Sequence, residues 1–400
     1  MSTLTSKQRF LAALRREIPD RVPVAPDISN YVPLRHTTLP FWDIYFFGAY
    51  PHWQAYLDAI DYYGADAWVA PVMYIPFVYE QTDVTVHTVT HYDKSRDAMI
   101  SDTTTSTPHG VLTSQLLCFR HEPAARTSRP IKDLAKDLPA FWDTEPMPVG
   151  IDWDALRPQI EACRARNIAF GVTLPYPGFH MWEGQVQGGI IPLSYIETDR
   201  PALLEEWAER DMVRYERQLE IMLESGVLDY LLYGGSGTIT LASPALARKY
   251  ALPALKKWSR MTKEAGLPTM LHSCGKNREL IKMLAEETDI DVANPLEPPP
   301  AGDVDLAEAK RLYGQRLGFM GNLHTSDVML LGTPDYVREM SVRAMRDAGL
   351  GGGFILSTGD QCGLGTPDEN LFAMVEAAQR YGRYDPVTGE LPDLPPPEQA

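Results

Sequence analysis

Short apolar runs recur along the chain, and nearly every one is followed by a stretch of helical periodicity. Eight such runs lie at 22–26, 67–72, 168–174, 229–233, 268–273, 291–295, 317–322 and 353–358. Runs that are apolar on both faces and separated by helices indicate parallel strands covered on each side. Eight of them predict an α/β fold in which the strands close into a (β/α)₈ TIM barrel.

The alternation of strand and helix is interrupted between residues 73 and 150. The segment TDVTVHTVTHYD and the threonine-rich stretch 103–107 are typical of hairpin strands, and the proline-rich run 123–148 is typical of loop. We therefore expect one barrel domain over residues 1–383, with an insertion of about 73–150 after the second strand. The proline-rich, acidic tail at 384–400 is expected to be mobile.

Composition and charge narrow the class of protein. The chain is 44% hydrophobic and 22% charged, which is typical of a globular enzyme with a large buried core. Its 37 Lys and Arg against 53 Asp and Glu give a formal charge of -16, so we expect no nucleic-acid partner. The apolar stretch FLAAL is too short for a signal-peptide core, and no run approaches the roughly 18 apolar residues of a membrane span. We therefore expect a cytoplasmic protein without membrane contact.

The four cysteines fall into two groups. Cys118 lies in the apolar run LLCF and Cys163 in a helical stretch, so both are expected in the core. Cys274 lies two residues after His272 in LHSCGK, at the end of the fifth predicted strand. Because side chains two apart on a strand point the same way, these two can share one metal ion.

A third soft ligand, Cys362, follows the eighth predicted strand. In a barrel the carboxyl ends of all strands meet at one rim, so Cys362 is expected beside His272 and Cys274. One imidazole and two thiolates leave the fourth position of a tetrahedral zinc ion open, as in catalytic sites. Glu297 in NPLEPPP is a candidate for that position at rest, although an exposed loop carboxylate is an equal alternative.

Other residues at the predicted rim are candidates for substrate or cofactor contacts. Gly235 and Gly237 lie in the loop YGGSGT after the fourth strand, where a tight turn and a close approach of a ligand both remain open. Asn322, His324 and Asp327 follow the seventh strand. We take Asn322 as a residue that orients substrate, whereas Asp327 is equally explained as a helix cap.

The chain resembles the uroporphyrinogen decarboxylase superfamily over nearly its whole length. The segments that carry this resemblance are SKQRFLAALRREIPDRVPVAP, SPALARKYALPALKKWSRMTKEAGLPTMLHSCGK, NPLEPPPAGDVDLAEAKRLYG and TPDENLFAMVEAAQRYG. Decarboxylases of this superfamily carry a Gln-Ala-Gly-Arg type segment after the first strand and Gly-His-Gly after the last, where this chain has DISNYVPLRHTT and TGDQCG. The zinc-dependent corrinoid methyltransferases, such as those that methylate coenzyme M, carry ligands that match His272, Cys274 and Cys362.

This resemblance implies an activity as well as a barrel. It implies methyl transfer between a corrinoid, carried on a separate corrinoid protein, and a small thiol or folate acceptor activated by zinc. Glu297 and Asn322 are catalytic candidates by their positions after the sixth and seventh predicted strands, and the resemblance itself adds only the three metal ligands. A metal-free decarboxylase and a non-catalytic corrinoid- or tetrapyrrole-binding protein are the alternatives.

Overall fold

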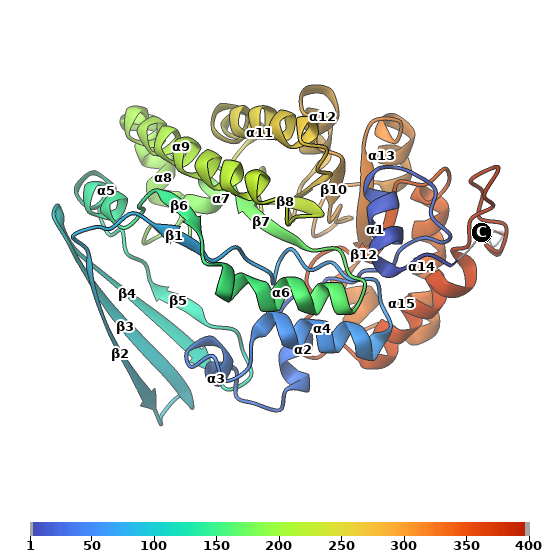
Figure 1. The fold of residues 1–400 in the computed structure, drawn as a ribbon, viewed down its shortest axis with the longest axis horizontal. Helices are drawn as coiled ribbons and strands as arrows, with labels where there is room; N and C mark the ends of the chain where they lie inside the picture. The colour runs from blue at the N-terminus through green and yellow to red at the C-terminus, as the bar shows by residue number, and fades with distance from the viewer. Residues whose placement is uncertain (1–2, 397–400) are drawn as a thin grey trace.

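A six-stranded parallel sheet forms the centre of the molecule (Figure 1). The computed structural model describes residues 3–396 of the chain. In spatial order the strands are β7 Gly171–Pro175, β8 Tyr230–Gly234, β9 Thr269–His272, β10 Val292–Asn294, β11 Gly318–Leu323 and β12 Phe354–Thr358. These strands coincide with the last six predicted runs and follow one another in chain order, so the α/β fold with a parallel sheet is confirmed.

The first two predicted runs are extended segments rather than regular strands. Residues 22–26 meet β12 through a parallel bridge between Val24 and Leu356. The run at 67–72 begins beside them, where the amide of Asp66 donates to the carbonyl of Val24 at 2.7 Å. Prolines explain the irregularity, because VPVAP and AWVAPV contain residues that lack the N–H a strand ladder requires.

Helices cover the outside of the sheet (Figure 1). The principal ones are α1 Ser6–Leu14, α6 Trp153–Ala165, α9 Pro201–Ser225, α11 Leu252–Glu264, α12 Arg278–Glu287, α13 Leu306–Tyr313, α14 Pro334–Ala348 and α15 Asp368–Tyr381. The other helical elements are α2 Tyr31–His36, α3 Phe41–Tyr45, α4 His52–Tyr63, α7 Phe179–Trp182, α8 Ile190–Asp199, α10 Pro244–Leu246, and the π-helical turns η1 Ala247–Ala251 and η2 Thr325–Leu330. Within residues 3–396, no helix is both long enough and apolar enough to span a membrane.

The segment expected as an insertion forms a second, antiparallel sheet that extends away from the central one (Figure 1). Its strands are β2 Thr85–Asp93, β3 Ala98–Thr107, β4 Gly110–Phe119 and β5 Ala125–Ser128, in that spatial order. Strands β1 Phe77–Tyr79 and β6 Pro148–Ile151 pair antiparallel at the base, and helix α5 Leu134–Asp143 packs on β4. The single-domain boundary at residue 383 stays a prediction.

The described part of the proline-rich tail touches the body of the protein. The hydroxyl of Tyr384 donates to the carbonyl of Gly349 at 2.7 Å, and the side chain of Leu391 is buried. Residues 397–400 of the expected mobile tail lie outside the described residues. The mobility of the tail stays a prediction.

A buried ion network ties the N-terminal helix to the two irregular segments. Asp66, whose side chain is 2% exposed, accepts from Arg9 at 2.7 Å and from Arg21 at 3.0 Å. Its second oxygen also accepts from the backbone amide of Val24 at 3.0 Å. Asp20 binds the far side of the Arg9 guanidinium at 2.7 Å. One carboxylate therefore holds together helix α1, the run at 22–26 and the run at 67–72.

Replacing Asp66 with alanine should destabilise the protein strongly. Asp66→Ala leaves two buried guanidinium groups without a shared acceptor, and breaking a buried ion pair from one side costs about 3–5 kcal/mol of the free energy of unfolding. The measurement is the shift of the urea unfolding curve relative to wild type.

Asp335→Ala is the matched control, because Asp335 is 97% exposed and pairs with its helix neighbour Arg338. Exposed pairs of this kind contribute about 0–1 kcal/mol. Equal shifts for the two variants would contradict a structural role for the Asp66 network.

Candidate metal centre

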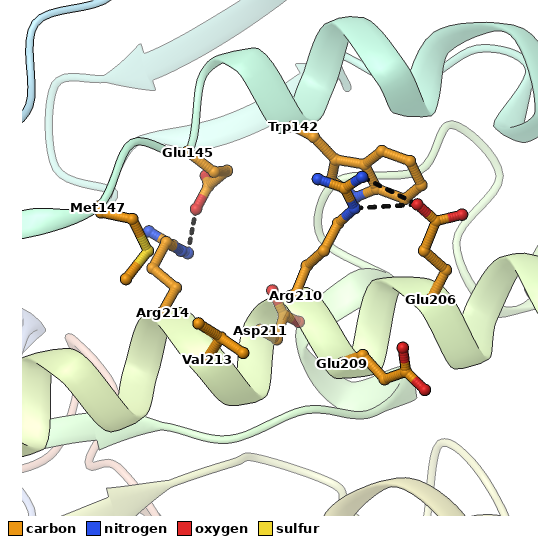
Figure 2. A pocket seen from close by; sticks show the side chains of 9 residues that line it. All are labelled: Trp142, Glu145, Met147, Glu206, Glu209, Arg210, Asp211, Val213 and Arg214. Carbon is orange, nitrogen blue, oxygen red and sulfur yellow. Dashed lines mark hydrogen bonds and ion pairs between the residues drawn. The ribbon is translucent and has the colours of Figure 1, made fainter.

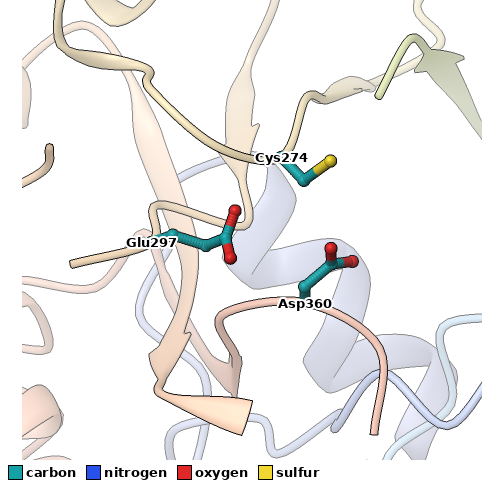
Figure 3. Close-up of side chains that lie close together, drawn as sticks. All are labelled: Cys274, Glu297 and Asp360. Carbon is teal, nitrogen blue, oxygen red and sulfur yellow. The ribbon is translucent and has the colours of Figure 1, made fainter. Parts of the chain in front are cut away.

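Three acidic or thiol side chains converge at the carboxyl ends of the central strands (Figure 3). Cys274 follows β9, Glu297 follows β10 and Asp360 follows β12. One ligand atom of each lies within 4.8 Å of the other two. Because parallel strands end on the same edge of a sheet, residues distant in sequence meet here, where active sites of α/β proteins assemble.

The backbone around Cys274 is shaped to bring Glu297 close. The amide of Gly275 donates to the Glu297 carboxylate. Gly275 has φ +84°, a left-handed conformation that disfavours a side chain, and a Cβ atom there would lie 2.2 Å from the hydroxyl oxygen of Thr240. The same threonine accepts from the amide of Lys276 at 2.8 Å, which fixes the loop after β9.

The electrostatics of this cluster favour a bound cation. Burial, together with the nearby Asp360 carboxylate, raises the pKa of the Cys274 thiol to about 11. Burial also raises the pKa of Glu297, again with Asp360 as a like-charged neighbour. A divalent cation would relieve this repulsion and accept all three donors, since zinc binds thiolate sulfur and carboxylate oxygen alike. The donor set therefore fits zinc.

His272 lies beside this cluster but is not one of its three members. Its Nδ1 lies 2.6 Å from the amide oxygen of Asn294, whose own NH₂ group donates to the carbonyl of Met320 at 3.3 Å. An acceptor at Nδ1 places the ring proton there and leaves Nε2 with a free lone pair, the arrangement of a metal-binding histidine. Asn294 therefore orients the ring of His272. In the sequence, the feature that could have indicated this role is the position of Asn294 at the end of a predicted strand.

Cys362 lies deeper than Cys274. Its side chain is fully buried, and burial raises the pKa of its thiol to about 12. Its amide donates to the carbonyl of Asp27 at 2.8 Å, which joins the loop after β12 to the loop after residues 22–26. The ligand set of His272, Cys274 and Cys362 stays a prediction. In the observed geometry, Asp360, two residues before Cys362, is the group that joins Cys274.

The remaining sequence candidates occupy separate places. Gly235 lines the cavity beside His272, and a Cβ atom there would lie 2.2 Å from the hydroxyl oxygen of Tyr176. Gly237 has φ +75° and shapes the turn behind it. The Asn322 amide donates to the carbonyl of Leu296 at 3.1 Å and lines a neighbouring cavity. The predicted cofactor and catalytic roles of these three residues stay predictions.

A cavity of about 510 Å³ opens beside the cluster. It is lined by Asp27, Ser29, Trp68, Pro71, Thr173, Pro175, His180, Met181, Leu232, Gly234, Gly235, Ser236, His272, Asp360 and Gln361. Burial lowers the pKa of His180 to about 3, so that ring is neutral near pH 7. The sequence did not single out His180, which helix α7 places in the wall of the cavity. The volume suits a small substrate.

A second cavity, of about 440 Å³, lies between helix α9 and the segment after α5 (Figure 2). Its two arginines are already paired, Arg214 with Glu145 and Arg210 with Glu206 at 2.9 Å. It lies away from the strand ends that carry the cluster, so we do not regard it as the reaction site.

Comparison with known proteins relates part of the chain to one family. Residues 214–381, less than half of the chain, match the family model described as uroporphyrinogen decarboxylase. The resemblance expected from the sequence is thereby confirmed, and the matched segment includes Cys274, Glu297, Asp360 and Cys362.

Curated relatives from both branches of the superfamily match the chain. A methylated-thiol–coenzyme M methyltransferase from Methanosarcina mazei is 30% identical over 154 residues, 38% of each chain. A methylcobamide:CoM methyltransferase from the same organism is 30% identical over 186 residues, 46% of this chain and 50% of its own. A uroporphyrinogen decarboxylase from Microcystis aeruginosa is 30% identical over 138 residues, 34% of this chain and 37% of its own. The matched part of the chain thus spans half or less of the length of these relatives.

A solved structure supports the fold over a longer stretch. A methyltransferase from Methanosarcina mazei superposes with a TM-score of 0.63 and 18% identity, over 94% of this chain and 98% of its own. At this identity the likeness describes the fold.

Alanine at Gly275 should disturb the cluster. Gly275→Ala adds a Cβ atom at 2.2 Å from Thr240 and places it on a left-handed backbone, so we expect a loss of about 1–3 kcal/mol in the free energy of unfolding. Urea unfolding of the purified variant measures this loss.

Gly363→Ala is the control, because no atom lies within 4 Å of a Cβ atom built there. We expect its stability to stay within about 0.5 kcal/mol of wild type. A Gly275 variant as stable as the Gly363 variant would refute the close packing of this loop.

Proposed function

We propose that this protein is a zinc-dependent methyltransferase that moves a methyl group between a corrinoid and a small thiol or folate acceptor. The observation that carries this proposal is the thiol of Cys274 beside two carboxylates and a cavity, at the carboxyl ends of a parallel sheet. The methyltransferase names of two relatives support the same reaction class.

The architecture proposed for this function is a closed barrel. Residues 22–26 and 67–72 would complete the ring between β12 and β7. The bridge from Val24 to Leu356 supports this closure on one side. The hydrogen bond from the Thr173 hydroxyl to the carbonyl of Ala70, at 2.9 Å, supports it on the other.

We assign the metal to the rim cluster. Cys274, Glu297 and Asp360 are the ligands supported by their mutual distances, and His272 and Cys362 are the ligands supported by the sequence resemblance. When bound, zinc would lower the pKa of an acceptor thiol so that the thiolate is available near neutral pH.

The side chains around the cluster bind and orient the reactants. Asn294 holds the His272 ring, and the Gly275 amide holds Glu297. The absence of a side chain at Gly235 preserves the contact between Tyr176 and His180, whose ring centroids lie 4.5 Å apart and of which His180 lines the cavity. These contacts fix the wall before substrate enters, which reduces the entropy lost on binding.

A metal-free decarboxylase, the activity named for one relative, is the second candidate. It assigns no role to the cluster of Cys274, Glu297 and Asp360. Metal content therefore separates the two enzymes, and a binding protein without turnover is separated from both by the absence of product.

Substitution of single ligands should separate the two ligand sets. We expect wild type to bind about one zinc ion per chain, and Cys274→Ser to weaken binding by at least about tenfold and abolish demethylation of methylcobalamin. Asp360→Asn tests the set supported by the distances, and Cys362→Ser tests the set supported by the resemblance. Zinc stoichiometry, thermal unfolding and methyl transfer are measured on each variant.

Cys163→Ala is the control for loss of a thiol, because Cys163 lies buried in the core near the N-terminus of β7. It should retain zinc. A metal-free wild type with full activity would overturn the zinc mechanism, and a zinc-loaded wild type that is inactive with every thiol and folate acceptor would favour the binding protein.

We propose further that a corrinoid protein docks on the insertion sheet. Ile131, in the loop after β5, bridges to Val186, just beyond helix α7, so the insertion adjoins the element that carries His180 into the cavity wall. Strand β2 is exposed along its length, and Val89 and Val111 present apolar surface, at 51% and 62% exposure. A partner bound here would reach the rim of the sheet.

Charges on this surface should impair transfer from a protein-bound donor selectively. We expect the double variant Val89→Glu and Val111→Glu to lower kcat/KM at least about tenfold with a methylated corrinoid protein, because buried unpaired charges oppose association. Its rate with free methylcobalamin should stay near that of wild type.

Val387→Glu is the matched control, since Val387 is 89% exposed in the C-terminal segment, at the opposite end of the molecule (Figure 1). Equal losses with free and protein-bound donor, or an equal loss in the control variant, would argue against docking on the insertion.

A further inference from the structure

The cavity beside the candidate metal centre lacks positive side chains. Among the described residues that line it, two are acidic, Asp27 and Asp360, and none is lysine or arginine. The Glu297 carboxylate adjoins Asp360 at the same rim. An anionic group on a substrate would therefore meet like charges and no positive side chain in this cavity.

The histidines of the cavity do not replace a lysine or arginine. Burial lowers the pKa of His180, which leaves its ring neutral. The Nδ1 of His272 faces the amide oxygen of Asn294, and in the proposed role of metal ligand its other ring nitrogen would bind the ion and not the substrate. Neither ring offers a permanent cation to a sulfonate or carboxylate.

Arg35 lies outside the lining of the cavity, where its charge partly offsets the rise that burial causes in the pKa of the Cys362 thiol. Both terminal nitrogens of its guanidinium already have partners. Its guanidinium donates to the carbonyls of Leu364 at 2.6 Å and Thr366 at 2.7 Å, and it forms an ion pair with Asp368. An arginine with these partners is not free to bind a substrate anion.

A metal ion would not reverse the charge of the site. Cys274, Glu297 and Asp360 would together bring three negative charges when they bind a cation, and zinc brings two positive ones. Burial raises the pKa of Asp27, yet a protonated Asp27 still leaves the cavity without a positive side chain.

The polar groups of the cavity suit a hydrogen-bond donor. The Gln361 amide donates to the Ser29 hydroxyl at 2.9 Å, and that hydroxyl donates to Asp27 at 2.6 Å. This chain of bonds ends on the Asp27 carboxyl group in the lining of the cavity, and an ionised carboxylate accepts hydrogen bonds and does not donate them. A hydroxyl or ammonium group on the substrate would find acceptors there.

We infer that the methyl acceptor is a small thiol whose far end is uncharged or cationic, and not an anionic thiol such as one that carries a sulfonate. The inference rests on the proposed methyl transfer and names the acceptor class for that site. It separates this chain from the coenzyme M activity named for its relatives. In the reaction the acceptor sulfur forms a bond to the methyl carbon, the electron pair of the broken methyl–cobalt bond stays on the corrinoid, and the thiol proton passes to solvent.

Three thiols that share an ethane skeleton test the inference. They are cysteamine, 2-mercaptoethanol and 2-mercaptoethanesulfonate, whose far ends are cationic, neutral and anionic. With methylcobalamin as donor we expect the first two to exceed the sulfonate in kcat/KM by at least about tenfold, with the difference falling as salt is added.

Binding of the methylated products supplies a readout besides activity. The S-methyl thioethers of the three thiols have no titrating sulfur, so calorimetric affinities report the far end alone. We expect the amine and the alcohol to bind at least about tenfold more tightly than the sulfonate.

Met181→Lys places a cation in the wall of the cavity, and Met181→Gln is the matched neutral control, since Met181 lines the cavity and is partly exposed. The lysine variant should gain affinity for the sulfonate thioether, and the glutamine variant should not. Transfer to the sulfonate at a rate equal to or above the other two would overturn the inference and leave the methyltransferase intact. Transfer to none of the three, nor to a folate, would overturn both.

Discussion

Mutual repulsion among Cys274, Glu297 and Asp360 is the constraint on which the candidate site depends. Two carboxyl groups and a thiol lie within 4.8 Å of one another, and burial raises the pKa of both Cys274 and Glu297. Such a cluster is stable only with protons or a cation between its members. The fold must hold these groups in place against that repulsion, and it does so with backbone amides and short loops rather than with neighbouring positive side chains.

The sheet supplies this support because its strands are parallel and consecutive. Strands β9, β10 and β12 end on the same edge of the sheet, and hydrogen bonds between neighbouring strand ends fix the start of each loop. The amide of Ser273 donates to the carbonyl of Asn294 at 2.9 Å, and the amide of Gly359 donates to that of Leu323 at 2.7 Å. These bonds leave the side chains one or two residues further on with little freedom, so the cluster is preorganised by main-chain geometry.

The sequence predicts the parallel sheet well because the six later runs carry proline only at their ends. It predicts the two N-terminal segments less well. Their apolar pattern is typical of strands, but Pro23, Pro26 and Pro71 lack the N–H groups that a ladder of strand hydrogen bonds requires. For the site, the pattern directs attention to the loops after β9, β10 and β12, which carry Cys274, Glu297 and Asp360. It does not identify Asp360. A sequence-based search for zinc ligands favours thiols over carboxylates, because thiolates are the softer ligands. Only the fold shows that, within TGDQCG, the side chain of Asp360 lies close to Cys274.

The contact between residues 22–26 and strand β12 affects folding during translation, because the two segments lie far apart in the sequence. The Ser357 hydroxyl donates to the carbonyl of Ala25, a residue 332 positions earlier. During synthesis the N-terminal segment leaves the ribosome long before its partner strand exists, and it must stay out of unproductive associations until the last strand emerges. The nascent chain therefore carries an unpaired apolar segment while the next 332 residues are translated, and contacts of that segment with helix α1 and Asp66 would cover part of it in the meantime.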